Sequence, residues 1–143
     1  STEFKPRTTN KVISLVTEWK NKDGTIEKRN KDSEKGGTMR LGAQKASLLK
    51  GSLARSLYKN KTIFERHRHR YEVNPDYVST LEGKGLIVSA RSEIHNLVEM
   101  IELKNHPWFL ACQFHPEFTS KPKTGHPLFN DFIKTAVKLK DKK

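Results

Sequence analysis

Cysteine, long apolar runs and acidic residues are all scarce in this chain of 143 residues. A single cysteine, Cys112, excludes an internal disulfide framework and favours a reducing compartment, so we expect a cytoplasmic protein. No apolar run approaches the roughly 20 residues that a membrane-spanning helix needs, so we expect no membrane association. The N-terminus has neither a hydrophobic signal core nor an initiator methionine. We therefore expect the chain to be a segment of a longer protein.

The shortage of acidic residues leaves a strongly positive chain. Asp and Glu number 16 against 28 Lys and Arg, which gives a formal net charge of +12. Such a charge attracts polyanions, for example nucleic acid, nucleotides or an acidic partner surface. Much of the excess lies in two lysine-rich stretches, residues 20–35 and 134–143, which are typical of a solvated face and a frayed end. Charge alone therefore does not favour nucleic acid as a partner.

The apolar residues fall in clusters that predict one domain with mixed secondary structure, either α/β or α+β. Strands are predicted over residues 11–19, 38–49, 62–73, 86–90, 97–103 and 108–114, with a hairpin turn at Asp23-Gly24 and a mobile loop over residues 30–37. Helices are predicted over residues 52–58, 76–82 and from Gly125-His126-Pro127 onward. The last helix carries a broad apolar stripe, which predicts that it packs on the core; the stripe comprises Leu128, Phe129, Phe132, Ile133, Ala136, Val137 and Leu139.

His115 and Glu117 stand where an apolar strand ends, the place where α/β folds commonly present side chains to ligands. Histidine can take and return a proton near neutral pH, provided that a partner fixes its tautomer. Glu117 can be that partner, because residues two apart in an extended segment face the same side and Pro116 restricts the link between them. By itself the tripeptide is a weak signal, since it also occurs by chance.

Cys112 is the obvious candidate nucleophile for this pair, but the period of a strand argues against it. Cys112 shares a face with Phe114, whereas His115 shares the opposite face with Gln113. We therefore interpret Cys112 as a buried, inert thiol. Any nucleophile for His115 must come from elsewhere, and no serine lies in a Gly-x-Ser-x-Gly elbow.

The basic run from Arg66 to Arg70 alternates arginine with histidine. Its arginines face one side of an extended chain and suit a carboxylate or phosphate, because a guanidinium group binds either in a bidentate manner. His67 and His69 face the other side and could bind a metal only with a further ligand, for which no Cys or Glu stands at a supporting spacing. We therefore expect no metal site, and the lack of alternating aromatic residues disfavours a nucleic-acid strip.

Several long strings, in order and in register, resemble the C-terminal half of the CTP synthase family. These strings run from Gly36 to Gln44, from Glu65 to Asn74, from His106 to Trp108, from Gln113 to Ser120 and from Gly125 to Phe129. The similarity extends from Ser1 to about Val137 and leaves the lysine-rich tail unplaced. It implies an α/β fold of the class I glutamine amidotransferase (flavodoxin-like) type, with residues 1–143 forming only the C-terminal portion of the domain.

The resemblance also implies roles for particular residues. In the family a Cys-His-Glu triad hydrolyses glutamine, and the matching positions here are His115 as base and acid and Glu117 as its orienting carboxylate. Glu3 matches the acidic residue near the substrate amino group, and Arg70 matches the arginine that binds the substrate carboxylate. Arg66 and Arg68 are then left for packing, ion pairs or a domain interface.

What the family has and this chain lacks is the nucleophile. The resemblance places the nucleophile in a Gly-x-Cys-x-Gly elbow upstream of Glu3. It also implies a separate synthase domain that uses ATP and Mg²⁺ and responds to GTP, and a full-length protein that assembles as a homotetramer. No cofactor site is then expected within residues 1–143, and the isolated segment is expected to be inactive. Removing half of a parallel sheet would also expose an unpaired edge, so stability in isolation is doubtful. The alternative is a non-catalytic basic module, derived from an amidotransferase, that binds nucleotides or nucleic acid.

Overall fold

The computed structural model describes residues 1–15, 18–20, 26–28 and 39–141. Its strands are β1 (Ile13–Leu15), β2 (Glu18–Lys20), β3 (Ile26–Lys28), β4 (Arg40–Leu48), β5 (Thr62–His69), β6 (Tyr71–Val73), β7 (Leu86–Ser92), β8 (Val98–Leu103) and β9 (Leu110–Cys112). Its helices are α1 (Leu53–Tyr58), α2 (Pro75–Glu82), the short 3₁₀ turn η1 (Pro116–Phe118) and α3 (Pro127–Lys140). The predicted turn at Asp23-Gly24 and the loop over residues 30–37 lie outside the described residues.

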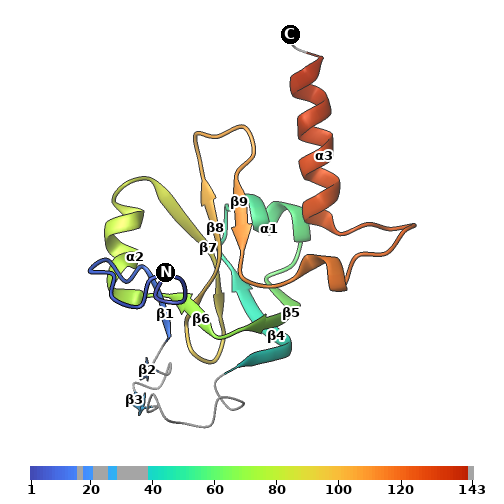
Figure 1. Ribbon diagram of the computed structural model, residues 1–143. Helices are drawn as coiled ribbons and strands as arrows, with labels where there is room; N and C mark the ends of the chain where they lie inside the picture. Colours follow the sequence, from blue (N-terminus) through green and yellow to red (C-terminus); the bar gives the residue numbers. More distant parts are fainter. Residues whose placement is uncertain (16–17, 21–25, 29–38, 142–143) are drawn as a thin grey trace.

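A twisted sheet of five strands, in the order β5-β4-β7-β8-β9, forms the centre of the molecule (Figure 1). Every strand pair in the described ranges is antiparallel, and β4 pairs with β5 from Arg40 opposite His69 to Ser47 opposite Thr62. Short connections such as residues 93–97 between β7 and β8 explain this direction, because parallel neighbours need a crossover of a dozen residues or more. The parallel pairing expected of a flavodoxin-like sheet is thus not found in the described part of the chain.

Two small sheets lie at one side of the large sheet. β1 pairs with β6, with Ile13 opposite Val73, and the N-terminal segment joins them because the Thr2 amide donates to the Ile13 carbonyl at 2.9 Å. β2 pairs antiparallel with β3, with Trp19 opposite Glu27. The predicted strand over residues 62–73 is in fact two strands that break at Arg70, so only Arg66 to His69 of the basic run belong to β5.

α1 lies within the predicted range of residues 52–58, and Ser52 is its N-cap. The Ser52 hydroxyl accepts from the Arg55 amide at 3.1 Å, and the buried Glu102 carboxylate accepts from the amides of Leu53 and Ala54 at 2.8 and 2.7 Å. The Glu102 carboxylate at the N-terminus of α1 accepts hydrogen bonds from amides that have no acceptor within the helix. The main core cluster forms between α1, the start of α3 and the sheet; its buried members are Ala46, Leu48, Ala54, Ile63, Ala90, Met100, Phe114 and Leu128.

α2 packs on the other side of the sheet from α1 (Figure 1). Asn74 caps it, and Pro75 begins it one residue earlier than the sequence predicts, because the first helical position needs no backbone donor. Val78 of α2 contacts a second, smaller cluster with Val88 and Val98. The two clusters hold the sheet between helices, and no helix among the described residues is long and apolar enough to cross a membrane.

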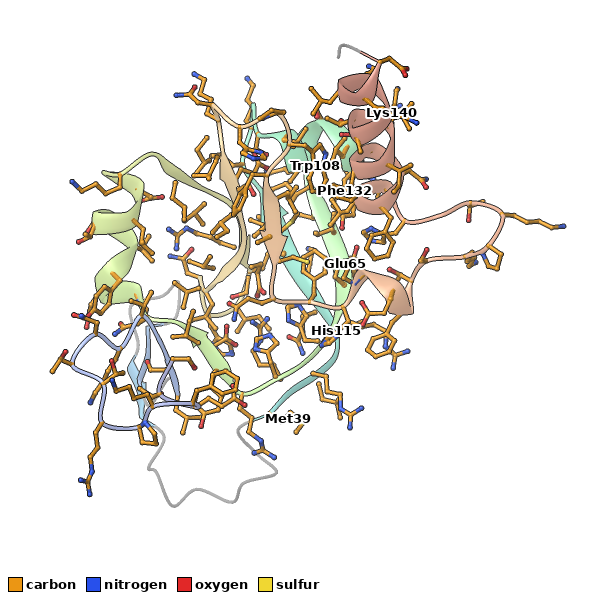
Figure 2. The ribbon with its side chains drawn as sticks, turned by 45° about the horizontal axis from the view of Figure 1, so that its top comes forward. Met39, Glu65, Trp108, His115, Phe132 and Lys140 are labelled. Carbon is orange, nitrogen blue, oxygen red and sulfur yellow. The ribbon has the colours of Figure 1, made fainter. Side chains whose placement is uncertain are left out.

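The prediction that α3 packs on the core is confirmed for its first turn and wrong for the rest of the apolar stripe. Only Leu128 in its first turn is buried, while Phe132, Ile133 and Val137 are 49%, 59% and 53% exposed. Trp108 contacts the stripe once, with its ring 5.1 Å from that of Phe132 and its indole N–H donating to Asp131 at 2.8 Å (Figure 2). Beyond that contact the helix projects from the body of the molecule (Figure 1). Its pattern is amphipathic, but the described residues leave most of the apolar stripe uncovered.

Candidate active site

His115 and Glu117 form the hydrogen-bonded pair that the sequence predicts. His115 Nδ1 lies 2.7 Å from Glu117 Oε1, and both side chains are accessible to solvent. His115, which is labelled in Figure 2, follows β9, and its amide donates to the Arg66 carbonyl at 2.8 Å. The hydrogen bonds from its own backbone amide and from His115 lower the pKa of Glu117, so it is ionised at neutral pH. This arrangement leaves His115 Nε2 available for proton exchange.

The pair is positioned by η1, which departs from the extended geometry that the sequence predicts. η1 begins at Pro116, where a proline suits the first helical position, and the Phe118 amide donates back to the His115 carbonyl at 3.2 Å. The Phe118 ring lies 5.2 Å from the His115 ring, and Arg66 lies over the same phenyl ring at 5.7 Å. Glu117 therefore reaches His115 by a tight turn and not by strand alternation.

Cys112 is not placed to be the nucleophile. It packs against the main core cluster on the face of Phe114, and its thiol donates to the Phe114 carbonyl at 3.4 Å. Burial raises the pKa of Cys112 to about 12, with further effects of nearby carboxylates, so the thiolate is scarce at neutral pH. The predicted strand parity is confirmed, although β9 itself is only three residues long.

The basic run alternates as predicted. Arg66 and Arg68 are exposed on β5, while His67 is 2% exposed and His69 is half-buried. Arg70 is half-buried at the break between β5 and β6. Its position beside the small sheet, rather than along β5, separates it from the other two arginines.

Glu3 and Arg70 both belong to the region of the small β1–β6 sheet. Glu3 is exposed in the N-terminal turn that Thr2 ties to β1, and Arg70 immediately precedes β6. His115 and Glu117, in contrast, follow the last strand of the large sheet. The predicted site residues therefore come from two sheets that meet at one side of the molecule (Figure 1).

A buried polar cluster, which no sequence pattern indicates, lies where those sheets meet. Arg40 donates to Glu99 Oε1 at 2.6 Å and to Glu72 Oε1 at 3.2 Å, and His67 Nε2 lies 3.7 Å from Glu99 Oε2. Desolvation raises the pKa of Glu72 to about 7 against the opposing effect of Arg40, and it lowers the pKa of His67 to about 3 and that of His69 to about 4. Both imidazoles are thus neutral at pH 7.

Glu99 also completes a group that could hold a metal ion. Ligand atoms of His67, His69 and Glu99 all lie within 4.8 Å of one another. Sequence spacing could not show this, because Glu99 lies on β8, far along the chain from the histidines of β5. The His67 nitrogen nearest His69 is not the one that faces Glu99, and Arg40 occupies the other Glu99 oxygen. The geometry therefore favours a hydrogen-bonded chain over three ligands directed at one point.

A second missed cluster centres on Glu65 of β5, which is 4% exposed. Its carboxylate accepts from Tyr58 at 2.7 Å and from Thr119 at 3.1 Å, and it lies 2.8 Å from His126 Nε2. The other His126 nitrogen accepts from the Leu128 amide and caps α3, so Nε2 is the protonated nitrogen. One carboxylate thus joins α1, the end of η1 and the start of α3.

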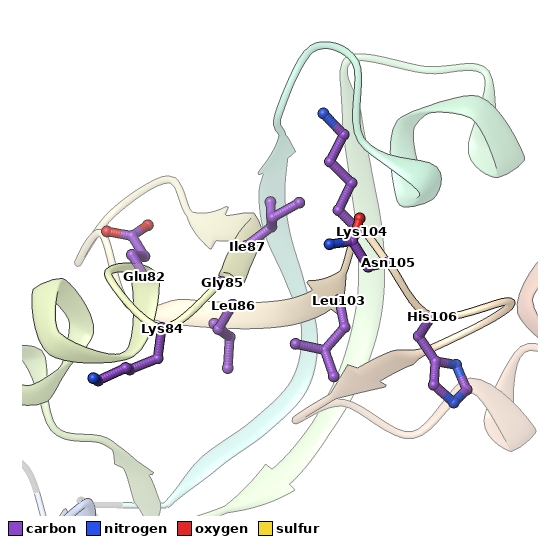
Figure 3. Close-up of a pocket in the computed structure, with 9 residues that line it drawn as sticks. All are labelled: Glu82, Lys84, Gly85, Leu86, Ile87, Leu103, Lys104, Asn105 and His106. Atoms are coloured by element: carbon purple, nitrogen blue, oxygen red, sulfur yellow. The ribbon is translucent and has the colours of Figure 1, made fainter.

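Figure 3 shows a shallow pocket of about 520 Å³ at the end of β8. His115 follows β9, which runs antiparallel to β8 and leads away from this end of the sheet. The pocket is formed where α2 leads into β7 and β8 ends, with Leu86, Ile87 and Leu103 beside the side chains of Lys84 and Lys104. No predicted site residue lines it. The candidate active site is therefore the accessible region around His115, not this pocket.

The fold and the site together define a class of protein. A model of the glutamine amidotransferase class-I family matches residues 11–135, and the chain therefore belongs to this family. A crystal structure of a putative GMP synthase protein from Thermoplasma acidophilum has the same kind of fold, with a TM-score of 0.51 and 21% identity over 72% of this chain and 47% of that chain.

Within this family the chain is similar to the glutaminase domain of a CTP synthase. The solved structure of that domain from Trypanosoma brucei, with acivicin bound, matches it with a TM-score of 0.77 and 35% identity. The match covers 96% of this chain and 50% of the trypanosomal chain. The predicted family and fold are thus confirmed, and the chain spans half the length of the structure that it matches.

Proposed function

We propose that this chain supplies the acid–base pair of a Cys-His-Glu glutaminase triad in a CTP synthase. The observation that carries the proposal is the 2.7 Å contact between His115 Nδ1 and Glu117 Oε1 in a member of the class I amidotransferase family. Glu117 selects the tautomer with the proton on Nδ1, so Nε2 can act as a base, and the ionised carboxylate stabilises the imidazolium that forms. Neither role needs a residue outside this chain.

The nucleophile in this scheme is a cysteine thiol of the same protein outside residues 1–143. His115 Nε2 takes its proton, and the thiolate sulfur bonds to the side-chain amide carbon of glutamine. The resulting imidazolium returns the proton to the leaving nitrogen, so the carbon–nitrogen bond breaks and ammonia departs. Water, deprotonated by the same Nε2, then cleaves the thioester and gives glutamate and the free thiol.

Glutamine itself is held, in this proposal, by Glu3 near its amino group and by Arg70 on its carboxylate. Both residues lie at the small sheet beside the site, which supports a shared role. The released ammonia serves a synthase domain outside these residues that makes CTP from UTP with ATP and Mg²⁺ and is activated by GTP. A homotetramer in the cytoplasm remains our expectation for the whole protein.

The proposal is tested by asking whether the full-length protein of the source gene forms CTP from glutamine as well as from free ammonia. We expect both nitrogen sources to support CTP formation, with glutamate released when glutamine is used. Formation from ammonia alone would refute the glutaminase role of this chain. The positive net charge supports the alternative function, binding of nucleotides or nucleic acid. That alternative predicts binding of oligonucleotides that weakens steeply as the salt concentration rises.

Arg70→Lys in the full-length protein should raise the Michaelis constant for glutamine by about 10-fold or more, because a single ammonium cannot replace a bidentate guanidinium. The rate with ammonia should stay unchanged, since no glutamine is bound in that reaction. Steady-state kinetics with each nitrogen source measure both quantities. The exposed neighbour Arg68 offers a matched control, and Arg68→Lys should leave the constant unchanged. Equal effects of the two substitutions would remove Arg70 from the glutamine site.

A further inference from the structure

The proposed glutamine-holding residues and the proposed acid–base pair lie on different sheets. Arg70 leads into β6, which pairs only with β1 among the described strands, whereas His115 follows β9 of the large sheet. The distance between substrate carboxylate and base therefore depends on how the two sheets are joined. The affinity for glutamine then depends on the place that this junction gives to Arg70.

The Tyr71 carbonyl, adjacent to Arg70, is one point of contact between the sheets. It accepts two hydrogen bonds, from His69 Nδ1 at 3.0 Å and from Gln113 Nε2 at 3.1 Å. Gln113 precedes His115 by two residues, and its own amide donates to the Glu99 carbonyl of β8 at 3.0 Å. Gln113 thus connects the residue beside Arg70 directly to the segment that carries His115.

The orientation of His69 is fixed by its neighbours. A carbonyl can only accept, so His69 Nδ1 carries the proton towards Tyr71, and in the neutral imidazole Nε2 must accept. His67 Nδ1 lies 2.9 Å from that Nε2 and donates to it. His67 in turn is held in place by burial and by the nearby Phe114 ring at 5.9 Å. The donor towards Tyr71 is therefore determined by buried groups.

Arg40 supplies a second connection one residue further along β6, at Glu72, whose carboxylate also lies 3.4 Å from His69 Nδ1. Its guanidinium bridges Glu72, next to Tyr71, and Glu99 of β8, and all three side chains are at least nine-tenths buried. Two successive residues of β6 are thereby connected to the large sheet: Tyr71 through its backbone carbonyl and Glu72 through its side chain. The start of β6 is held at the point where Arg70 must be placed.

We propose that Gln113 and His69 are positioning residues that hold the Tyr71 carbonyl and thereby set the place of Arg70 relative to His115. This inference rests on the proposed glutaminase function. Gln113 is the sharper probe of the two, because its Oε1 is buried without a hydrogen-bond partner among the described residues. Replacing the amide with an apolar group of similar shape removes the donor and leaves no new buried acceptor on that side chain.

In the full-length enzyme, Gln113→Met should raise the Michaelis constant for glutamine by about 3- to 10-fold, the size of effect that one hydrogen bond can have. The turnover rate with saturating glutamine and the rate with ammonia should each change by less than about 2-fold, since positioning of the substrate carboxylate is what is disturbed. Gln44→Met is the matched control, because Gln44 also donates to a backbone carbonyl, that of Leu41, away from the sheet junction. It should leave the Michaelis constant unchanged.

A double-mutant cycle separates positioning from general loosening. If Gln113 acts through Arg70, then Gln113→Met in the Arg70→Lys background should change the Michaelis constant for glutamine by less than about 2-fold further. Multiplicative effects of the two substitutions would overturn the inference, and so would an unchanged constant in the single Gln113 variant. If the wild-type protein did not use glutamine at all, that result would instead refute the proposed function.

His69 provides a second pair of variants should the Gln113 variant fail to fold, as judged by its thermal unfolding. Asparagine can place a side-chain N–H near the position of Nδ1, whereas leucine cannot. His69→Asn should therefore keep the Michaelis constant for glutamine within about 3-fold of wild type, and His69→Leu should raise it by about 10-fold. If His69→Asn and His69→Leu both folded and had the same Michaelis constant for glutamine, the result would contradict a role for the N–H group that His69 donates to the Tyr71 carbonyl.

Discussion

His115→Ala in the full-length protein should abolish glutamine-dependent CTP formation, lowering its rate by at least about 10³-fold, while formation from ammonia continues. The loss is large because triad members act as a unit: without the imidazole the thiol keeps its proton and the leaving nitrogen receives none. The His115 side chain is 37% exposed and contacts Phe118 and Glu117 at an accessible position, so its removal should not unfold the domain. Initial rates with saturating glutamine and with ammonia are the two measurements.

His106→Ala is the matched control for this substitution. His106 is an exposed histidine at the opposite end of the sheet, where it accepts from the Trp108 amide and lines the pocket of Figure 3. Both rates should survive its replacement. Retention of the glutamine reaction in the His115 variant would remove His115 from the mechanism, and loss of both reactions would indicate a structural role instead.

Arg40→Ala should destabilise the fold by about 3–5 kcal/mol, the usual cost of leaving buried charge without its partner. The guanidinium is the only described cation that contacts both Glu72 and Glu99, which are 1% and 0% exposed. Without it, both carboxyl groups must become protonated or stay buried as unpaired charges. The free energy of unfolding, measured by urea denaturation of the glutaminase domain, reports this cost.

The effect of Arg40→Ala should also depend on pH in a defined direction. Arg40 opposes the upward pKa shift that desolvation imposes on Glu72 and Glu99, so its removal raises both values further. When the pKa of a carboxyl group is higher in the folded than in the unfolded state, the free energy of unfolding falls as the pH rises from the unfolded-state pKa through the folded-state pKa. The variant should therefore be least destabilised near about pH 5 and most destabilised near about pH 8.

Lys45→Ala, on the same strand, is the control for the Arg40 variant. Lys45 pairs with Glu93 at 3.0 Å, but the two side chains are 43% and 26% exposed. Water screens such a pair, so its loss should cost less than about 1 kcal/mol. Similar destabilisation by both substitutions would show that the buried cluster is no stronger than a surface ion pair.

Local patterns predicted the elements because each depends on neighbouring residues in the chain. Ser52 and Asn74 cap their helices through amides two or three residues away, and the alternation of β5 separates arginines from histidines. The orientation of Cys112 followed from the same period of two. The pairing of His115 with Glu117 was also predicted, although the 3₁₀ turn between them was not.

Contacts between distant segments could not be predicted in this way. Arg40 and Glu99 are 59 residues apart and Glu65 and His126 are 61 apart, and no periodic pattern relates either pair. The only sequence signal of such clusters is a charged residue at a strand position that the pattern predicts to be buried. That signal does not indicate which distant residue will pair with it. The strings from Gly36 to Gln44 and from Glu65 to Asn74 contain Arg40 and Glu65, but the resemblance gives no reason for these two residues.

The apolar stripe of α3 shows a different limit. Its spacing correctly predicted an amphipathic helix, and Leu128 is buried as expected. Amphipathicity requires a partner surface but does not say whether the same segment of chain provides it. Five large apolar side chains of α3 remain at least 42% exposed here; they are Phe129, Phe132, Ile133, Val137 and Leu139.

The most direct test of the proposed triad is to stop glutamine turnover by the full-length protein with acid and to locate the covalent intermediate by peptide mass spectrometry. The proposed chemistry predicts a γ-glutamyl thioester on a cysteine outside residues 1–143, within a Gly-x-Cys-x-Gly sequence, that is absent from the His115→Ala variant. A thioester on Cys112, or glutamine turnover in a protein without such a cysteine, would contradict it.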